Sequence, residues 1–370
     1  MMASDTPVNT TAKIDLIPLP SEQSHELLMA VIGILSFFCV LGTVGNSLVI
    51  YVYVRKRNKL ASTVFIITLA CTDLVTCVLI IPYTIVLEYM DYFIKYDILC
   101  KCYMFLITSN VPFSAFIMMA IAVDRYFCIC LPFTHFLTTR RAKLIIMILA
   151  SFAFMLGIIT ALNFGVYSSA RGNRTKSVLM YDGICKPNGL IFNHTFTETY
   201  QKIYSSFFII VIVVVVILYI MVYRFVSLRR ARRRRMRYQS SGYSSCKDHA
   251  ASYLNTRALL TNGCVKTELE PYSELEERPK SEKTEINRQM TIRERGLVAN
   301  IRTAGMLFVV TAVFIVVFLP AWLMAHQVIP YNILIFYMYF FYNVANPIIY
   351  AFMNTAFRRD LKDVVKCRLT

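Results

Sequence analysis

The run from Phe207 to Val222 reads FFIIVIVVVVILYIMV and contains no charged residue. Such a run is too long for an ordinary core helix and suits a bilayer span of roughly 20 residues. The composition agrees, because 57% of the 370 residues are hydrophobic and the mean hydropathy is positive, at +0.54. In a soluble domain about half of the residues are apolar, and they are scattered in short periodic sets. The sequence therefore predicts a membrane protein.

Seven apolar segments follow one another along the chain, and we predict an all-α bundle of seven transmembrane helices. The predicted spans are Leu27–Val54, Val64–Tyr89, Cys100–Ile121, Leu144–Val166, Tyr200–Phe225, Ile301–Val328 and Tyr331–Met353. The chain then divides into an outer tail, the first five helices, a third inner loop, the last two helices and an inner tail. These parts are 1–26, 27–226, 227–296, 297–353 and 354–370.

The cations near the ends of the spans predict the orientation. Acidic residues dominate before the first span, and four cations follow it: Arg55, Lys56, Arg57 and Lys59. Because Lys and Arg are enriched in cytoplasmic loops, the N-terminus is predicted to be extracellular and the C-terminus cytoplasmic. The tail before the first span lacks the apolar core of a cleavable signal, so that span is expected to direct membrane insertion.

Three glycosylation sequons agree with this orientation. They begin at Asn9, Asn173 and Asn193, and all three fall on the predicted outer side.

The third inner loop is rich in Ser, Glu, Lys and Arg and poor in bulky apolar residues. We expect it to be largely disordered, with helical extensions at its two ends. The basic run Arg229–Arg235 either contacts anionic lipid head groups or serves as a stop-transfer cluster. The net charge of +17 does not indicate a nucleic-acid partner, because the cations lie beside the apolar runs rather than on an amphipathic face.

The third span is followed by Asp124-Arg125-Tyr126. An arginine at the inner membrane face is costly to bury and usually functional. The adjacent carboxylate can hold the guanidinium by a charge-assisted bond, and loss of that bond frees Arg125 to point elsewhere. The triplet therefore predicts a switch.

The seventh span ends in Asn346-Pro347-Ile348-Ile349-Tyr350. Pro347 frees a backbone carbonyl and bends the helix. Asn346 and Tyr350 supply polar groups that can bond in two arrangements, so this segment is a second candidate switch.

In the sixth span Phe314 and Phe318 lie on one helical face just inside the bend expected at Pro320. We interpret the pair as a packing switch. In the first span, Asn46 is the expected hydrogen-bond partner of the second and seventh spans.

Asp73 lies about ten residues into the apolar second span. A carboxylate at that depth needs a cation or a proton. Ser114, Asn343 and Asn346 are candidate oxygen donors, and we predict a sodium pocket that stabilises the resting state. The alternative is a protonated Asp73 in a structural polar network. No other cofactor is predicted.

Together the motifs resemble the rhodopsin-like family of G-protein-coupled receptors. They are Gly45-Asn46, Leu69…Asp73, Cys100, Asp124-Arg125-Tyr126, Phe314…Phe318-Leu319-Pro320 and Asn346-Pro347…Tyr350. The resemblance extends from about Leu27 to Cys367. It implies a plasma-membrane receptor whose inner partners are heterotrimeric G proteins and arrestin.

The resemblance also implies roles for single residues. Arg125 would contact the G protein when the sixth span swings outward. Cys100 would form a disulfide with Cys185 of the second outer loop, with Cys102 as a rival partner. Thr355–Val365 resembles a short amphipathic eighth helix, and Cys367 after it resembles a palmitoylation site.

The chain departs from the family pattern in four places. The fourth span has no Trp, the fifth has no Pro near Val211, and Phe318 stands where the family usually has Trp. The first outer loop also lacks the usual Trp and has Tyr92 and Phe93 nearby. Two of these departures lie in spans five and six, the segments that carry activation in the family. We take Tyr219 as the inner tyrosine of span five.

The ligand pocket is expected between spans three, six and seven. Its candidate residues are Ile107, Thr108, Val111, Trp322, His326 and Tyr339. Ile107 stands where amine receptors carry Asp, and no lysine occurs in Phe336–Asn343, where opsins hold retinal. The stretch Asn346–Arg358 resembles neuropeptide receptors, including the cholecystokinin-like group, and favours a peptide ligand.

Other functions remain as alternatives. A lipid or other non-amine small molecule is the second candidate ligand. A transporter or channel usually shows internal repeats and charged residues along a path. We find no repeat and predict only Asp73 well inside the spans. No metal motif, nucleophile elbow or Gly-rich phosphate loop indicates an enzyme.

Overall fold

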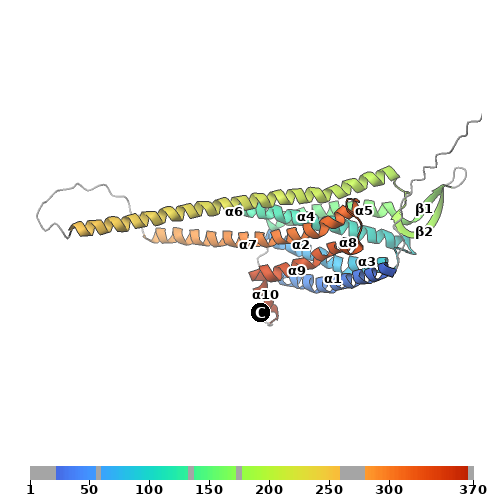
Figure 1. Ribbon diagram of the computed structural model, residues 1–370, viewed down its shortest axis with the longest axis horizontal. Coiled ribbons are helices and arrows are strands. Elements are labelled where there is room, and N and C mark those ends of the chain that lie inside the picture. Colours follow the sequence, from blue (N-terminus) through green and yellow to red (C-terminus); the bar gives the residue numbers. More distant parts are fainter. Residues whose placement is uncertain (1–21, 56–59, 132–136, 172–176, 259–279, 366–370) are drawn as a thin grey trace, which may run out of the picture.

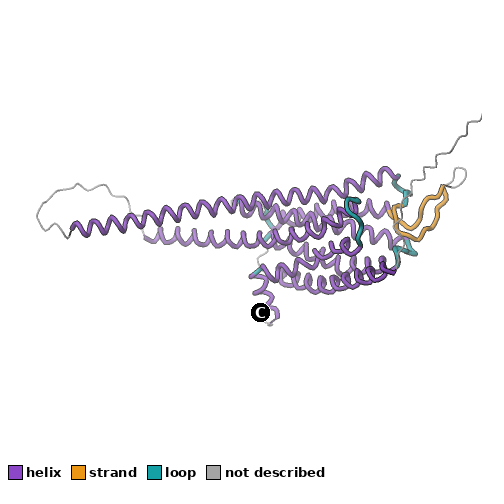
Figure 2. Tube along the Cα trace, viewed as in Figure 1, coloured by secondary structure: helices purple, strands orange, loops and turns teal. Residues whose placement is uncertain are grey.

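The computed structural model describes residues 22–55, 60–131, 137–171, 177–258 and 280–365. Helix dominates the described chain (Figure 2). Within it, seven helical stretches are long and apolar enough to cross a membrane, as the sequence predicted. The helices are α1 Glu22–Val54, α2 Ala61–Val75, α3 Ile81–Tyr89, α4 Asp97–Cys130, α5 Thr139–Asn163, α6 His194–Ala258, α7 Lys280–Ala325, α8 Ile333–Tyr337, α9 Phe341–Met353 and α10 Thr355–Val365.

Two spans change helix type along their length. In the second, a π-turn over Thr76–Ile80 joins α2 to α3. It precedes Pro82, which has no N–H and whose ring crowds the carbonyl of the preceding turn, so a widened turn relieves the clash. In the seventh, a 3-10 turn over Met338–Phe340 joins α8 to α9.

Helix α4 occupies the centre of the bundle and contacts α2, α5, α6 and α7. Its most apolar stretch is 67% buried, whereas the corresponding stretch of α1 is 22% buried and otherwise faces outward. The central position brings residues at both ends of α4 into contact with several helices at once. The helix also runs through Cys130, past the predicted end at Ile121, so Asp124, Arg125 and Tyr126 are helical.

The second outer loop adds strand to the predicted all-α architecture. Strands β1 (Phe164–Arg171) and β2 (Ser177–Pro187) form an antiparallel hairpin at one end of the bundle (Figure 1). Gly183 adopts φ +70°, which glycine tolerates, and its carbonyl accepts a hydrogen bond of 2.7 Å from the Ile94 N–H. Outside the bilayer, a two-stranded ladder satisfies backbone groups that the sequence pattern left unassigned.

At the opposite end, α6 and α7 project side by side beyond the other helices (Figure 1). In the predicted third inner loop, 227–296, the described residues are helical from the bundle to Ala258 and again from Lys280, so the helical extensions expected at its two ends are present and are long. The low apolar content indicated disorder, but Arg, Lys, Glu and Gln are strong helix formers, and each added residue extends an existing helix without new nucleation. Residues 259–279 lie outside the described chain.

After α9 the chain turns into α10, Thr355–Val365, which has the bounds predicted for the amphipathic helix. Its Phe357 is 2% exposed and packs between two aromatic rings, 5.9 Å from Tyr53 of α1 and 6.4 Å from Tyr350 of α9. This contact anchors α10 under the inner end of the bundle.

Candidate functional site

A cavity of about 290 Å³ opens between α4, α6, α7 and the start of the seventh span. All six predicted pocket residues line it: Ile107, Thr108, Val111, Trp322, His326 and Tyr339. Helix α6 adds Gln201, Tyr204, Ser205, Phe207 and Phe208, which sequence reasoning missed. None of the described lining residues is Asp, Glu, Lys or Arg, so the cavity offers an ammonium group no carboxylate.

Hydrogen bonds across the cavity hold its wall helices together. Pro112 frees the carbonyl of Thr108, four residues earlier in α4, and the Tyr204 hydroxyl of α6 donates to that carbonyl at 3.1 Å. On the far side, Trp322 Nε1 of α7 donates to the Ser205 carbonyl of α6 at 3.2 Å. Side-chain-to-backbone hydrogen bonds therefore join α6 to α4 and to α7 around the cavity.

An aromatic cluster forms the floor of the cavity. Phe314 and Phe318 of α7 lie 5.0 Å apart, and Phe208 of α6 packs on both, at 5.9 and 5.2 Å. Tyr339 contacts Phe318 at 5.1 Å, and Tyr342 of α9 meets Phe314 edge-on at 5.4 Å. Phe314 and Phe318 therefore line the cavity and contact the seventh span at the same time.

The bend of α7 lies directly outward of this cluster. Pro320 is inside the helix, so the backbone of the preceding turn lacks one hydrogen bond at that level. His326 stacks on Trp322 with ring centroids 4.1 Å apart, one turn beyond the bend. The predicted packing switch therefore joins the cavity and the bend in one segment.

Asp73 is completely buried in the middle of the bundle. Its Oδ2 accepts a hydrogen bond of 2.6 Å from Asn346 Nδ2 of α9, while its Oδ1 has no hydrogen-bond partner. Ser114 does not bond to Asp73, because its hydroxyl donates to Thr72 Oγ1 at 3.2 Å. Asn343 Nδ2 donates to the Phe340 carbonyl at 3.1 Å, and Asn343 Oδ1 is buried without a partner.

These oxygens fit a hard monovalent cation. Asp73 Oδ1 and the amide oxygens of Asn46 and Asn343 are buried acceptors without hydrogen bonds, and hard cations prefer oxygen ligands. No group of three or more His, Cys, Asp or Glu occurs among the described residues, so transition-metal chemistry has no candidate there. Asn46 Nδ2 also donates at 2.8 Å to the Asn343 carbonyl, which Pro347 deprives of its helical donor.

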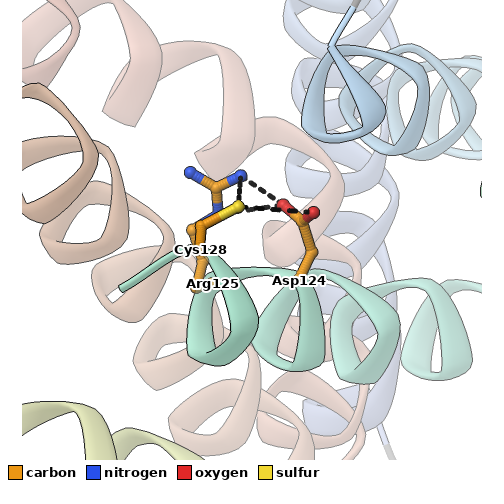
Figure 3. A network of polar contacts seen from close by, with 3 residues as sticks. All are labelled: Asp124, Arg125 and Cys128. Carbon is orange, nitrogen blue, oxygen red and sulfur yellow. Dashed lines mark hydrogen bonds and ion pairs between the residues drawn. The ribbon is translucent and has the colours of Figure 1, made fainter. Parts of the chain in front are cut away.

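At the inner end of α4, Asp124 and Arg125 form a buried ion pair (Figure 3). Arg125 Nε donates to Asp124 Oδ2 at 3.0 Å, and Nη2 donates to the same oxygen. The Cys128 thiol lies 3.9 Å from both partners. Tyr126 is half-buried and packs against the inner cluster that includes Ile129. The carboxylate therefore holds the guanidinium against its own helix.

Among the described residues, two buried tyrosines near the inner end have hydroxyls without hydrogen-bond partners. They are Tyr219 of α6 and Tyr350 of α9. Thr311, beside Tyr219, donates its own hydroxyl to the Leu307 carbonyl at 3.0 Å. A buried hydroxyl without a partner is unfavourable, so both tyrosines gain hydrogen bonds in any arrangement that brings new polar groups to them.

The outer end carries the expected disulfide between Cys100 of α4 and Cys185 of β2, while the rival Cys102 is free and exposed. Of the three sequons, only Asn193 is described. It is exposed, and its Oδ1 accepts from the Phe196 N–H at 2.8 Å in the first turn of α6. Asn9, Asn173 and Cys367 lie outside the described residues.

Sequence reasoning missed a further buried carboxylate besides Asp73 and Asp124, that of Glu88, which is 9% exposed at the outer end of α3. Glu88 lies in the last turn of the helix, next to a loop. Its burial depends on Tyr337 of the distant α8, which no local pattern indicates.

The sequence is similar to a known protein family and to several named receptors. Residues 45–350 match the family described as 7 transmembrane receptor (rhodopsin family). The human cholecystokinin receptor type A is 24% identical over 95% of this chain and 83% of that receptor. The mouse receptor of the same name is 28% identical over 41% of this chain, which spans only 34% of the mouse protein. The Xenopus laevis cholecystokinin receptor is 33% identical over 31% of this chain and 25% of its own length.

The family match covers most of the chain and includes every motif that carried the resemblance, from Asn46 to Tyr350. The chain belongs to the rhodopsin family of seven-transmembrane receptors.

Proposed function

We propose that this protein is a plasma-membrane receptor that binds an extracellular peptide and activates heterotrimeric G proteins. The carrying observation is the aromatic cluster, because Phe314 and Phe318 form the cavity floor and pack on Tyr339 and Tyr342 of the seventh span. A ligand that binds one arrangement of this cluster better than another shifts the population toward it. The N-terminus is then extracellular and the C-terminus cytoplasmic.

The proposed inner response starts from the Asp124–Arg125 ion pair. When α7 moves outward, Arg125 leaves the carboxylate and becomes available to a G protein or arrestin. The partnerless hydroxyls of Tyr219 and Tyr350 provide hydrogen-bonding groups for the rearranged bundle. In this proposal a sodium ion held by Asp73, Asn343 and Asn346 favours the resting arrangement. Palmitoylated Cys367 and the basic run Arg229–Arg235 bind membrane lipid.

The peptide assignment is supported by the relatives, which are named as cholecystokinin receptors. It is also supported by the absence of any acidic side chain among the described residues lining the main cavity, since that argues against a small amine. The β1–β2 hairpin provides an outer rim for a ligand that extends beyond the cavity.

The test is G-protein activation in cells that express the receptor, challenged with tissue extract before and after protease treatment. We expect activation by intact extract, loss of activation after protease, and no response from the Arg125→Ala variant at equal surface expression. Activity that survives protease would contradict a peptide and make a lipid or other small molecule the leading candidate.

A further inference from the structure

The Glu88 carboxylate is buried at the outer end of α3 without a cation. Its Oε1 accepts a hydrogen bond from the Tyr337 hydroxyl of α8. Among the described residues it forms no ion pair, and two lysines at the same end of the bundle pair with other carboxylates: Lys101 with Asp97 at 2.5 Å and Lys186 with Asp182 at 2.6 Å. A buried carboxylate is unfavourable unless a positive charge or a proton compensates it.

Four tyrosines from different elements lie near this carboxylate, and we call them the tyrosine cage. They are Tyr92, Tyr103, Tyr331 and Tyr337, each close enough to Glu88 to interact with it electrostatically. The Tyr92 and Tyr337 hydroxyls are 2.9 Å apart. Burial, with the nearby Tyr103 hydroxyl and Glu88 carboxylate, raises the pKa of Tyr92 above its ordinary value, so its phenol stays protonated.

The cage combines a negative charge with several aromatic rings. Ring faces attract cations through their quadrupole, and the attraction strengthens in a desolvated site. Phenol oxygens add acceptors, and the carboxylate supplies the countercharge. The chemistry that completes this arrangement is a positively charged nitrogen, either an ammonium or a guanidinium.

The cage adjoins the main cavity through the start of the seventh span. Tyr337 lies between Phe336 and Tyr339, which both line the cavity, with ring centroids at 5.3 and 6.5 Å. Tyr331 is 55% exposed and contacts Phe336 at 5.5 Å, so one member of the cage reaches the outer surface. A ligand in the cavity therefore has the cage beside it rather than across the bundle.

We propose that Glu88 and the tyrosine cage bind a cationic nitrogen of the ligand while its apolar part occupies the main cavity. This inference rests on the proposed function and adds the ligand chemistry: a peptide with a free amine or an arginine at the end that enters the bundle. Tyr337 would keep the carboxylate oriented, and Glu88 would become the countercharge that the cavity itself lacks.

The first test measures thermal unfolding of the purified full-length receptor in nanodiscs with small probes. N-acetyl-arginine amide carries only a guanidinium, alanine amide only an amine, and N-acetyl-citrulline amide no charge. We expect one or both cationic probes, but not the neutral probe, to raise the Tm of the wild-type receptor. Glu88→Gln should lose this increase, because it keeps a hydrogen-bonding group of the same shape and removes the charge.

The matched control is Glu198→Gln, which removes an outer carboxylate that is 57% exposed and paired only with His194. This variant should respond as the wild type does. Equal Tm increases with charged and neutral probes, or an increase retained in Glu88→Gln, would overturn the proposal. Sodium chloride at the same ionic strength provides a further check. If it raises the Tm of the wild type as much as the cationic probes do, and Glu88→Gln loses this increase, the site binds a simple ion and the proposal is overturned.

The second test uses the protease-sensitive activity of tissue extract. Glu88→Gln should lower the potency of the extract about 30-fold or more at equal surface expression, the usual result of removing one partner of a buried charge pair. Acetylation of amines and phenylglyoxal treatment of guanidines should abolish activation of the wild type. Unchanged potency in Glu88→Gln overturns the cation site and leaves the receptor function standing. If no extract activates the wild type, the proposed function fails and the probe experiment alone decides the site.

Discussion

Prolines explain where several polar side chains occur inside the apolar helices. Pro347 and Pro112 each leave one backbone carbonyl without its helical donor, and a side chain from another helix supplies the bond: Asn46 in the first case and Tyr204 in the second. Within a bilayer an unsatisfied carbonyl costs roughly several kcal/mol. Each of these hydrogen bonds therefore satisfies a carbonyl and also holds two helices together.

The Asp73→Asn substitution tests the proposed sodium pocket. Asparagine keeps the hydrogen-bonding shape beside Asn346 but removes the charge that would hold the ion. We expect basal G-protein activity of wild-type membranes to fall when sodium replaces potassium, and this fall to disappear in the variant. A sodium effect that persists in Asp73→Asn would place the ion elsewhere.

Arg125→Ala tests the inner switch. The guanidinium is 5% exposed and bonded to Asp124, so its removal deletes the group proposed to meet the G protein. We expect stimulated nucleotide exchange to fall at least about tenfold with surface expression retained. Arg55→Ala is the control, because Arg55 is an exposed inner-side arginine at the end of α1, stacked on Tyr51. Equal losses in both variants would indicate a general loss of positive charge instead.

At the scale of elements, α1 and α9 approach closely where Gly45 faces Pro347. A Cβ added at Gly45 would lie 2.8 Å from the Pro347 Cβ, whereas one added at Gly33 of the same helix would meet nothing within 4 Å. Gly45→Ala should therefore destabilise the receptor by about 1–3 kcal/mol through overpacking. Gly33→Ala should be neutral or stabilising by up to about 1 kcal/mol. Thermal unfolding in detergent compares the two, and equal Tm values would contradict the close approach.

The disulfide ties the β1–β2 hairpin to α4, and the Ile94–Gly183 hydrogen bond and the Cys185–Tyr92 backbone contact hold the same corner. Cys185→Ser should lower surface expression or ligand binding because the hairpin loses its covalent anchor. Cys100→Ser should have the same effect, and the double variant should add nothing to either. The free Cys102 provides the control, and Cys102→Ser should match the wild type. Additive losses would refute the pairing.

The seven spans were predictable from their local apolar signal, whereas the disulfide and α10 were expected from the resemblance to the receptor family. The predicted span limits differ from the observed helix ends by several residues, because a helix can continue beyond the apolar run. Helix α4, for example, continues to Cys130. The β1–β2 hairpin and the length of α6 were not predictable in this way. One depends on pairing across a loop, and the other on helix propagation through a polar sequence.

In the candidate site, the residues of α4 could be placed by their distance along the helix from Cys100. Trp322, His326 and Tyr339 were placed from the resemblance, which implies a pocket between spans three, six and seven. Phe208 and Tyr204 could not be placed, because an uninterrupted apolar run gives no sign of which face of α6 meets α4 and α7. Glu88 was missed for a similar reason. Its burial is created by Tyr337, 249 residues away in the chain.

At the scale of the whole molecule, orientation can be measured through the one described sequon. Thr195→Ala removes the acceptor signal at Asn193 and retains the Asn193 side chain that accepts from Phe196. We expect this variant to lose one glycan, detected as a mobility shift that glycosidase treatment of intact cells also produces in the wild type. If glycosidase changes the mobility of the wild type only after the cells are lysed, the glycan is not accessible from outside the cell. That result would contradict an extracellular N-terminus.

The projecting part of α7 has a mechanical consequence. From Pro320 to Lys280 the helix runs without interruption, roughly 60 Å at 1.5 Å per residue. A rotation of about 5° at the proline then displaces the far end by about 5 Å, close to one helical turn. The protein thus has a lever arm whose short side ends at the cavity. Its gain is set by helix length and stiffness, so shortening the projection would reduce the displacement at the far end without altering any residue that lines the cavity.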